Sequence, residues 1–325
     1  MNRSLFVRLA ATQLLMLPFG AMAQRGDARV RRLAIVVQGR GPSGVFHRTM
    51  QELGYTEGES LLIQVRGAGG DGRRFAPLIE ELIATGPEVI VAETTVAALA
   101  AKRATATIPI VFLNVSDPVG SGLVKSLARP GGNVTGGMDQ GTALAEKAVE
   151  LVRAIVPKAV RLGVLMSDIP VHPAQFERIR AAAERMSLSA LSFSVASIDD
   201  LDRAFDEMVA RKVDAFIPLG GAPLNATWAQ VDAVVALAAK TRLPAVYLVG
   251  DAVKRGGLMS YGTSLPARWK QAAVYVDRIL KGARPADLPV WQPTTFELFI
   301  NRKTFASLGL AIPPALLLQA DLVVN

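Results

Sequence analysis

The sequence predicts an α/β protein made of two consecutive lobes, each with a parallel sheet and helices on both faces. Strand-like and helix-like segments alternate along almost the whole chain, which is typical of a parallel sheet wound through crossover helices. The alternation is interrupted by a Gly- and Pro-rich stretch, residues 127–137, and then restarts. With 325 residues, half of them hydrophobic, the chain is long enough for two separate cores.

In the first half, each strand is an apolar run and each helix has a periodic apolar face. The apolar run Leu33–Val37 is the first expected strand, and a helix follows over Val45–Leu53. In the helical segment 72–86, Gly86 comes after the last turn and Pro87 lies beyond it, which is a stop signal. The remaining segments of this half are expected as strand 61–66, helix 72–86, strand 88–93, helix 96–104 and strand 108–115.

The second half repeats the pattern after the interruption. Its expected segments are helix 143–156, strand 161–166, helix 174–186, strand 191–196, helix 199–210, strand 214–219, helix 228–240 and strand 244–249. Three further segments follow: a short Gly-bounded strand at 256–262, a helix at 266–281 and an isolated strand, Phe296–Asn301, before a short terminal helix.

The Gly- and Pro-rich interruption and the last two strand-like segments predict a hinge. Its three crossing strands are expected near residues 134–138, 258–262 and 290–296. The first lobe is then expected to comprise residues 24–136 plus 262–292, and the second lobe residues 137–261 plus 293–325. Two α/β lobes joined in this way form a hinge architecture with a cleft between the lobes.

The first 23 residues have the pattern of a secretory signal peptide. Arg3 and Arg8 give a positive start, an apolar core runs over Leu9–Phe19, and Ala21-Met22-Ala23 is a small-x-small cleavage pattern. We therefore expect Sec-type export to a bacterial periplasm, with cleavage after Ala23. An uncleaved anchor is the alternative, although the apolar run is shorter than the roughly 20 residues that a span needs.

Composition excludes several kinds of site. Without cysteine the chain can form no disulfide, thiolate metal site, cysteine nucleophile or N-terminal lipid attachment. Its two histidines, His47 and His172, are far apart, which argues against a histidine dyad, a polyhistidine metal site or an enzyme using either. The basic residues are scattered without aromatic interleaving, so the net charge of +8 does not indicate nucleic-acid binding.

The stretch GRGPSG (Gly39–Gly44) matches G-x-G-x-x-G between an expected strand and an expected helix. It raises the alternative of an exported dinucleotide-dependent oxidoreductase. Pro42 argues against it, because a pyrophosphate loop needs main-chain N–H donors and proline has none. We expect no cofactor, and interpret the stretch as one rim of the cleft, where glycine lets the backbone approach a ligand closely.

Longer stretches carry a family resemblance. "ELGYTEGESLLIQVRGAGGDGRRF", "IPIVFLNVSDPVGSGLVKSLARPGGNVTGG", "GGLMSYG" and "FELFINRKTFASLGLAIPPALL" occur in this order. Together they resemble the periplasmic substrate-binding component of ABC transporters, in the family that includes tryptophan and tyrosine binding proteins. The resemblance spans about residues 30–323. It implies a type I periplasmic binding fold and ligand capture without catalysis.

Ligands of open α/β sheets collect beyond the carboxyl ends of the strands. Thr94 and Thr95 open a helix, where they could bind a carboxylate or simply cap the helix. Glu93 and Asp251 depart from the family pattern and are possible partners of a ligand amine. Asp117 is expected to cap a turn. The residues expected to bind ligand are Gln38, Ser43, Glu93, Thr94, Thr95, Asn114, Ser116, Gly220, Gly221, Asp251 and Tyr261.

The expected function is that of a periplasmic solute-binding protein of an ABC importer. It captures an amino acid or a similar small carboxylate or zwitterion by hinge closure, and delivers it to a permease and ATPase at the inner membrane. A sensory protein that presents its ligand to a receptor stays open as an alternative. Because proteins of this kind usually work alone, we expect a monomer.

Overall fold

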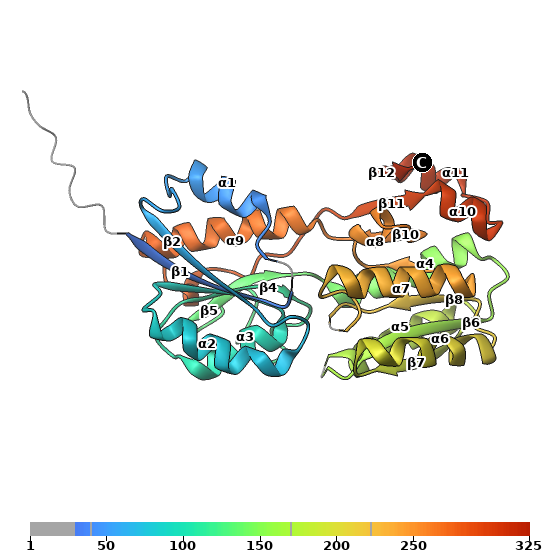
Figure 1. Cartoon of the computed structure of the whole chain (residues 1–325), viewed down its shortest axis with the longest axis horizontal. Coiled ribbons are helices and arrows are strands. Elements are labelled where there is room, and N and C mark those ends of the chain that lie inside the picture. Colours follow the sequence, from blue (N-terminus) through green and yellow to red (C-terminus); the bar gives the residue numbers. More distant parts are fainter. Residues whose placement is uncertain (1–29, 40, 170, 222) are drawn as a thin grey trace, which may run out of the picture.

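The computed structural model describes residues 30–39, 41–169, 171–221 and 223–325. The expected signal peptide and its cleavage site, as well as Arg40 of the GRGPSG stretch, lie outside these ranges. Two α/β lobes lie side by side along the long axis (Figure 1). Within the described ranges, no helix combines the length and hydropathy needed to cross a bilayer.

The first lobe is built on five parallel strands in the order β2-β1-β3-β4-β5. They are β1 (Arg31–Val37), β2 (Leu61–Gly67), β3 (Val89–Glu93), β4 (Ile110–Val115) and β5 (Val134–Met138). All five residues of β3 are buried, as expected for a strand covered by helices on both faces.

Helices cover both faces of this sheet. α1 (Gly44–Glu52) and α9 (Leu265–Leu280) cover one face, and α2 (Phe75–Ala84), preceded by a 3₁₀ turn (Gly72–Arg74), and α3 (Thr95–Ala104) cover the other. Alternate residues of β1 point to opposite faces: Ile35 belongs to the core that contains Trp269 of α9, and Val36 to the core that contains Phe75 of α2. The orange helix α9 therefore lies in the lobe that begins the chain, far from its neighbours in sequence (Figure 1).

The second lobe is built on strands in the order β7-β6-β8, continued through a bridge between Phe216 and Ala245 to β9-β10-β11-β12. The bounds are β6 (Arg161–Ser167), β7 (Ser189–Val195), β8 (Ala215–Pro218), β9 (Val246–Tyr247), β10 (Met259–Gly262), β11 (Glu297–Asn301) and β12 (Leu322–Val324). The pairing of β10 with β11 is antiparallel, whereas the other strand pairs of this lobe are parallel.

Two groups of helices complete the second lobe. α4 (Gly141–Ile155), α5 (His172–Arg185), α10 (Arg302–Leu308) and α11 (Pro314–Gln319) pack on one face. α6 (Leu201–Ala210), α7 (Trp228–Thr241) and α8 (Asp251–Lys254) pack on the other. A 3₁₀ turn, Ile198–Asp200, precedes α6, and another, Pro285–Asp287, lies beside β5 in the first lobe.

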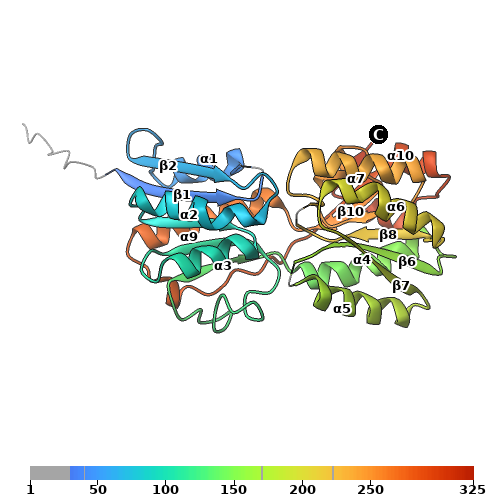
Figure 2. The ribbon, with the colours of Figure 1, turned by 60° about the horizontal axis from the view of Figure 1, so that its bottom comes forward.

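Three segments connect the lobes: residues 139–140 between β5 and α4, residues 263–264 between β10 and α9, and residues 292–296 before β11 (Figure 2). The third segment follows directly on a pairing with β5. Trp291 N donates to Gly136 O at 2.9 Å, and Met138 N donates to Trp291 O at 3.0 Å. The connections at residues 139–140 and 292–296 therefore begin side by side, at the end of β5 and at the segment paired with it.

Several sequence-based expectations for the second lobe are wrong. Phe296–Asn301 is not an isolated strand, because β11 pairs with both β10 and β12, which satisfies backbone groups that isolation would leave unpaired. The strand expected at 244–249 shrinks to the two residues of β9. Asp251, which was expected at the end of this strand, begins α8 instead. The chain ends in two short helices and β12, where only one helix was expected.

Candidate functional site

The carboxyl ends of three adjacent strands bring together Gln38, Glu93 and Asn114. Glu93, at the end of β3, is 7% exposed. Its Oε1 accepts a hydrogen bond from Asn114 Nδ2 at 2.8 Å, and its Oε2 accepts one from the backbone N of Gln38 at 3.2 Å. The Glu93 carboxylate therefore does not point outward: it links the ends of β1 and β4 across β3.

Backbone strain is stored at the same edge. Thr94 has φ +86° and Asn114 has φ +57°. Residues other than glycine rarely adopt positive φ values. The pairing of β4 with β5 also shifts register between Phe112 and Val115. A bulge of this kind redirects the side chain it contains, and here that side chain is Asn114.

Two polar atoms at this edge are buried and have no hydrogen-bond partner among the described residues. They are Ser43 Oγ and Asn114 Oδ1. Ser43 is the residue before α1, but its hydroxyl makes no capping bond. Buried polar atoms are nearly always satisfied, so each of these two leaves a position for a donor or acceptor that does not belong to the described chain.

Thr94 and Thr95 occupy the start of α3. Thr94 Oγ1 accepts from Ala97 N at 3.4 Å, which makes Thr94 the N-cap of this helix. Thr95 is the first helical residue. The expected capping role of Asp117 is confirmed as well, because its Oδ1 accepts from Gly120 N at 2.7 Å.

Ser116 lies where the first lobe meets the second. Its side chain converges on Gly141, the first residue of α4, together with Asp139 and Gln175. A Cβ placed on Gly141 would lie 2.7 Å from Ser116 Oγ, 3.1 Å from Gln175 Nε2 and 3.2 Å from Asp139 Oδ1. Gln175 belongs to α5 and is 5% exposed, so a buried amide of the second lobe lies close to a hydroxyl of the first.

Glycines mark two further contacts between the lobes. A Cβ on Gly39, after β1, would lie 2.6 Å from the carbonyl oxygen of Ala226 and 2.7 Å from Thr227 Cγ2. A Cβ on Gly70 would lie 2.7 Å from Gln230 Nε2. Ala226, Thr227 and Gln230 lie at the start of α7, in the second lobe. The lobes are therefore in contact on both sides of the strand ends that carry Gln38 and Glu93.

Gly220 and Gly221 form the loop after β8, whose neighbour Ala222 lies outside the described residues. Gly221 has φ +116°, and its N–H donates to Asn225 Oδ1 at 2.7 Å. His172 holds the same loop to the end of β6. Its Nδ1 accepts from Ser167 N at 2.9 Å, and its Nε2 lies 2.9 Å from Gly220 O. Nδ1 also lies 2.9 Å from Ser167 O, and burial lowers the pKa of His172.

The last two expected site residues lie elsewhere in the second lobe. Tyr261, in β10, stacks on Phe296 with ring centroids 5.7 Å apart. This pair therefore adjoins two of the three connecting segments. Asp251 Oδ1 lies 3.9 Å from Lys254 Nζ within α8. The described contacts bring neither residue to Gln38, Glu93 or Asn114.

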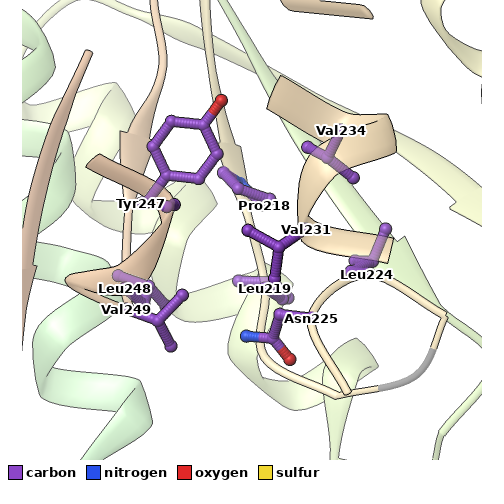
Figure 3. A pocket seen from close by; sticks show the side chains of 10 residues that line it. Pro218, Leu219, Leu224, Asn225, Val231, Val234, Tyr247, Leu248 and Val249 are labelled. Atoms are coloured by element: carbon purple, nitrogen blue, oxygen red, sulfur yellow. The ribbon is translucent and has the colours of Figure 1, made fainter. Parts of the chain in front are cut away.

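A small cavity lies inside the second lobe (Figure 3). Its walls are almost entirely apolar and include Leu219, Leu224, Val231 and Val249, with Asn225 as a polar exception. Its volume is about 10 Å³, close to the minimum for one water molecule. Tyr247 also lines it; its hydroxyl has no partner among the described residues, and burial raises the pKa of this phenol. The cavity is too small for an amino acid.

Residues of the second lobe that approach the site were missed by sequence reasoning. Gln175, Thr227 and Gln230 lie on helices, away from the strand ends that marked the expected residues. His172, which was not among the expected site residues, positions a loop in the structure. The Pro-flanked stretch around His172 was the available signal, since it marks an irregular segment after a strand.

Comparison with known proteins gives a consistent family. A family model described as "ABC transporter substrate binding protein" matches residues 42–324. A curated relative named tyrosine-binding protein, from Clostridioides difficile (strain R20291), is 26% identical over 266 residues, covering 82% of this chain and 75% of the relative.

Solved structures agree with this result. An ABC domain from Streptococcus pneumonia in complex with L-Trp is 28% identical and has a TM-score of 0.82, with 91% of this chain and 100% of that chain covered. A conserved domain protein from Vibrio cholerae is 27% identical and has a TM-score of 0.83 at the same coverage.

Proposed function

The chain belongs to the ABC transporter substrate-binding protein family, and from this premise we propose that it captures an amino acid between its two lobes for import. The family consists of binding proteins, not enzymes, so GRGPSG is not the cofactor loop of an oxidoreductase. The ligand, in this proposal, lies beyond the carboxyl ends of β1, β3 and β4, where the lobes meet.

The observation that carries the proposal is the pair of buried polar atoms without partners at this edge, Ser43 Oγ and Asn114 Oδ1. A binding protein needs a few fixed polar groups that a ligand completes. The strain at Thr94 and Asn114 supports the same location, because strained backbone persists at functional sites where the surrounding structure holds it in place.

An amino acid is the ligand class that the relatives favour. One relative is named tyrosine-binding protein and one solved relative contains L-Trp. Phe296 and Tyr261 offer aromatic faces near the connecting segments, suited to an apolar or aromatic side chain. Gln38, Ser43, Glu93, Thr94, Thr95, Asn114, Ser116, Gly220, Gly221, Asp251 and Tyr261 remain proposed ligand-binding residues.

The proposed mechanism is closure about the three connections. A ligand favours the closed arrangement only by the difference between its affinities for the closed and open forms. The difference between the two affinities is large when both lobes supply ligand-binding groups. The closed form then contacts the ligand from both lobes, whereas the open form contacts it from one lobe only. The closed protein then docks on the permease of an ABC importer and releases its ligand.

The proposed place of action is the periplasm, reached after cleavage of residues 1–23. Intact-mass measurement of protein recovered from the periplasm of an expressing bacterium tests this step. We expect a mature chain that begins at Gln24. A chain that keeps residues 1–23 would contradict the proposed export route.

Calorimetric titration with a panel of amino acids and small carboxylic acids tests the binding function. We expect one-site binding of at least one aromatic or aliphatic amino acid, and a rise in melting temperature that follows RT ln(1 + [L]/Kd). Absence of binding across all amino acids, in a protein shown to be folded, would reject this ligand class.

A further inference from the structure

Building on the proposed function, we propose that the Asn114 side-chain oxygen receives the ammonium group of the ligand and that Glu93 is the positioning residue that turns this oxygen toward it. The ligand class is thereby narrowed to molecules with a charged N–H donor, which separates an amino acid from a simple carboxylate. The inference rests on the hydrogen bonds that converge on Glu93.

The orientation of the Asn114 amide follows from its hydrogen bond to Glu93. Asn114 Nδ2 donates to Glu93 Oε1 at 2.8 Å, so the amide turns its nitrogen, and not Oδ1, toward this carboxyl group. Glu93 itself is held in place by the backbone N–H of Gln38 on its other oxygen. The amide cannot rotate by half a turn without placing two oxygens against each other.

The fixed amide leaves Oδ1 as an acceptor without a donor. The atom is buried, and none of the described residues donates to it. The missing partner must therefore be a donor, and of the charged ends of an amino acid only the ammonium group donates. A carboxylate at this position would face a carbonyl-type oxygen at hydrogen-bond distance, which is repulsive.

The position suits a ligand that enters between the lobes. Asn114 lies at the carboxyl end of β4, in a bulge and with left-handed backbone, both of which set the direction of its side chain. Ser116, two residues further on, already lies near Gln175 of the second lobe. A ligand at Asn114 is thus at the boundary between the lobes, where it is covered when they meet.

The two residues also permit an exchange that tests the inference. In the double variant E93Q/N114D, Gln at position 93 accepts from Gln38 N through its oxygen and donates to Asp at position 114 through its nitrogen. The second oxygen of that Asp still faces the ligand. The double variant therefore keeps the hydrogen bonds of position 93 to Gln38 and to position 114. It also keeps an acceptor oxygen at position 114 that faces the ligand, although the carboxyl group has moved from position 93 to position 114. In the single variant E93Q, the amide of Asn114 can instead flip and present Nδ2.

The experiment is calorimetric titration of the wild-type protein, E93Q and E93Q/N114D. The probes are L-tyrosine and L-tryptophan, each paired with its des-amino analogue, in which hydrogen replaces the amino group. We expect wild type to bind the amino acid roughly 10- to 100-fold more tightly than the analogue, the range for a hydrogen bond to a charged group. E93Q should lose most of this preference, and E93Q/N114D should regain it.

Two controls keep the result interpretable. Glu81→Gln makes the same chemical change on the exposed surface of the first lobe, where Glu81 pairs with Arg66, and should bind like wild type. Thermal unfolding of each ligand-free variant reports whether it folds.

Wild-type binding without preference for the amino acid overturns the inference while leaving the proposed function intact. The inference is also overturned if the folded E93Q keeps the wild-type preference, or if the folded double variant does not restore it. Failure of wild type to bind either amino acid would instead count against the proposed ligand class, and against the inference with it.

Discussion

Three residues with left-handed backbone lie where the lobes meet, and none of them is glycine. They are Thr94, Asn114 and Gln140, with φ of +86°, +57° and +55°. The other three described non-glycine residues with positive φ, Ser187, Lys212 and Arg242, follow the last turns of helices, where this conformation is ordinary. Thr94 and Asn114 belong to the proposed site and Gln140 to the segment that connects β5 with α4, and backbone of this kind costs about 1–3 kcal/mol at each position.

At the same scale, His172 is expected to make folding stability depend on pH. Its pKa is lowered in the folded protein by burial, from the ordinary value of 6.5. The unfolded chain therefore binds more protons than the folded chain between the folded pKa and 6.5. Stability should fall as the pH drops below about 6.5, and no penalty from this residue should remain above it.

Urea unfolding across pH 5 to 8 measures this effect. The variant His172→Gln should unfold more easily at pH 8 and lose part of the wild-type decline at low pH. The exposed His47 is present in both proteins, so its contribution cancels in the difference. An identical pH dependence in the two proteins would contradict the assigned role of His172.

At the scale of elements, β4 and its neighbours show how far the sequence predicts the site. The rule that ligands collect at strand carboxyl ends located Gln38, Glu93 and Asn114, which the structure joins by hydrogen bonds. The register shift in β4 was not predictable, because it depends on pairing with β5, a segment expected only as a crossover. The short β9 and the added β12 likewise depend on sheet pairing, which local patterns do not reveal.

Gly136 in β5 is expected to be essential for the β4–β5 pairing. It has φ +153°, and a Cβ there would lie 2.0 Å from Phe112 O. Gly136→Ala should therefore reduce the free energy of unfolding by about 3 kcal/mol or more, in the range of overpacked and strained positions. Gly132→Ala is the matched control, since a Cβ at Gly132 meets nothing within 4 Å. Equal stability of the two variants, measured by urea unfolding, would disprove this reading of β5.

At the scale of the whole molecule, the contact between Gly39 and the start of α7 is specific to the arrangement in which the lobes meet. An added Cβ would press against the Ala226 carbonyl oxygen at 2.6 Å, and we expect this to obstruct the proposed closure without disturbing the fold of either lobe. The sequence could not identify Thr227 or Gln230 as partners, because their approach depends on how the lobes are oriented about the three connections.

Gly39→Ala should weaken amino-acid binding by about tenfold or more, the equivalent of 1–3 kcal/mol of overpacking. The unfolding free energy of the ligand-free protein should change by no more than about 0.5 kcal/mol. Gly132→Ala, where a Cβ meets nothing within 4 Å, should bind like wild type. If calorimetry gives the same affinity for both variants, the contact at Gly39 has no part in closure.

Small-angle X-ray scattering of the purified protein, with and without saturating L-tyrosine or L-tryptophan, tests whether the two lobes close around an amino acid. Capture by closure of two lobes predicts a smaller radius of gyration with ligand, and a saturated scattering profile that matches the structure with its lobes in contact. Superimposable profiles with and without a bound amino acid would contradict capture by lobe closure.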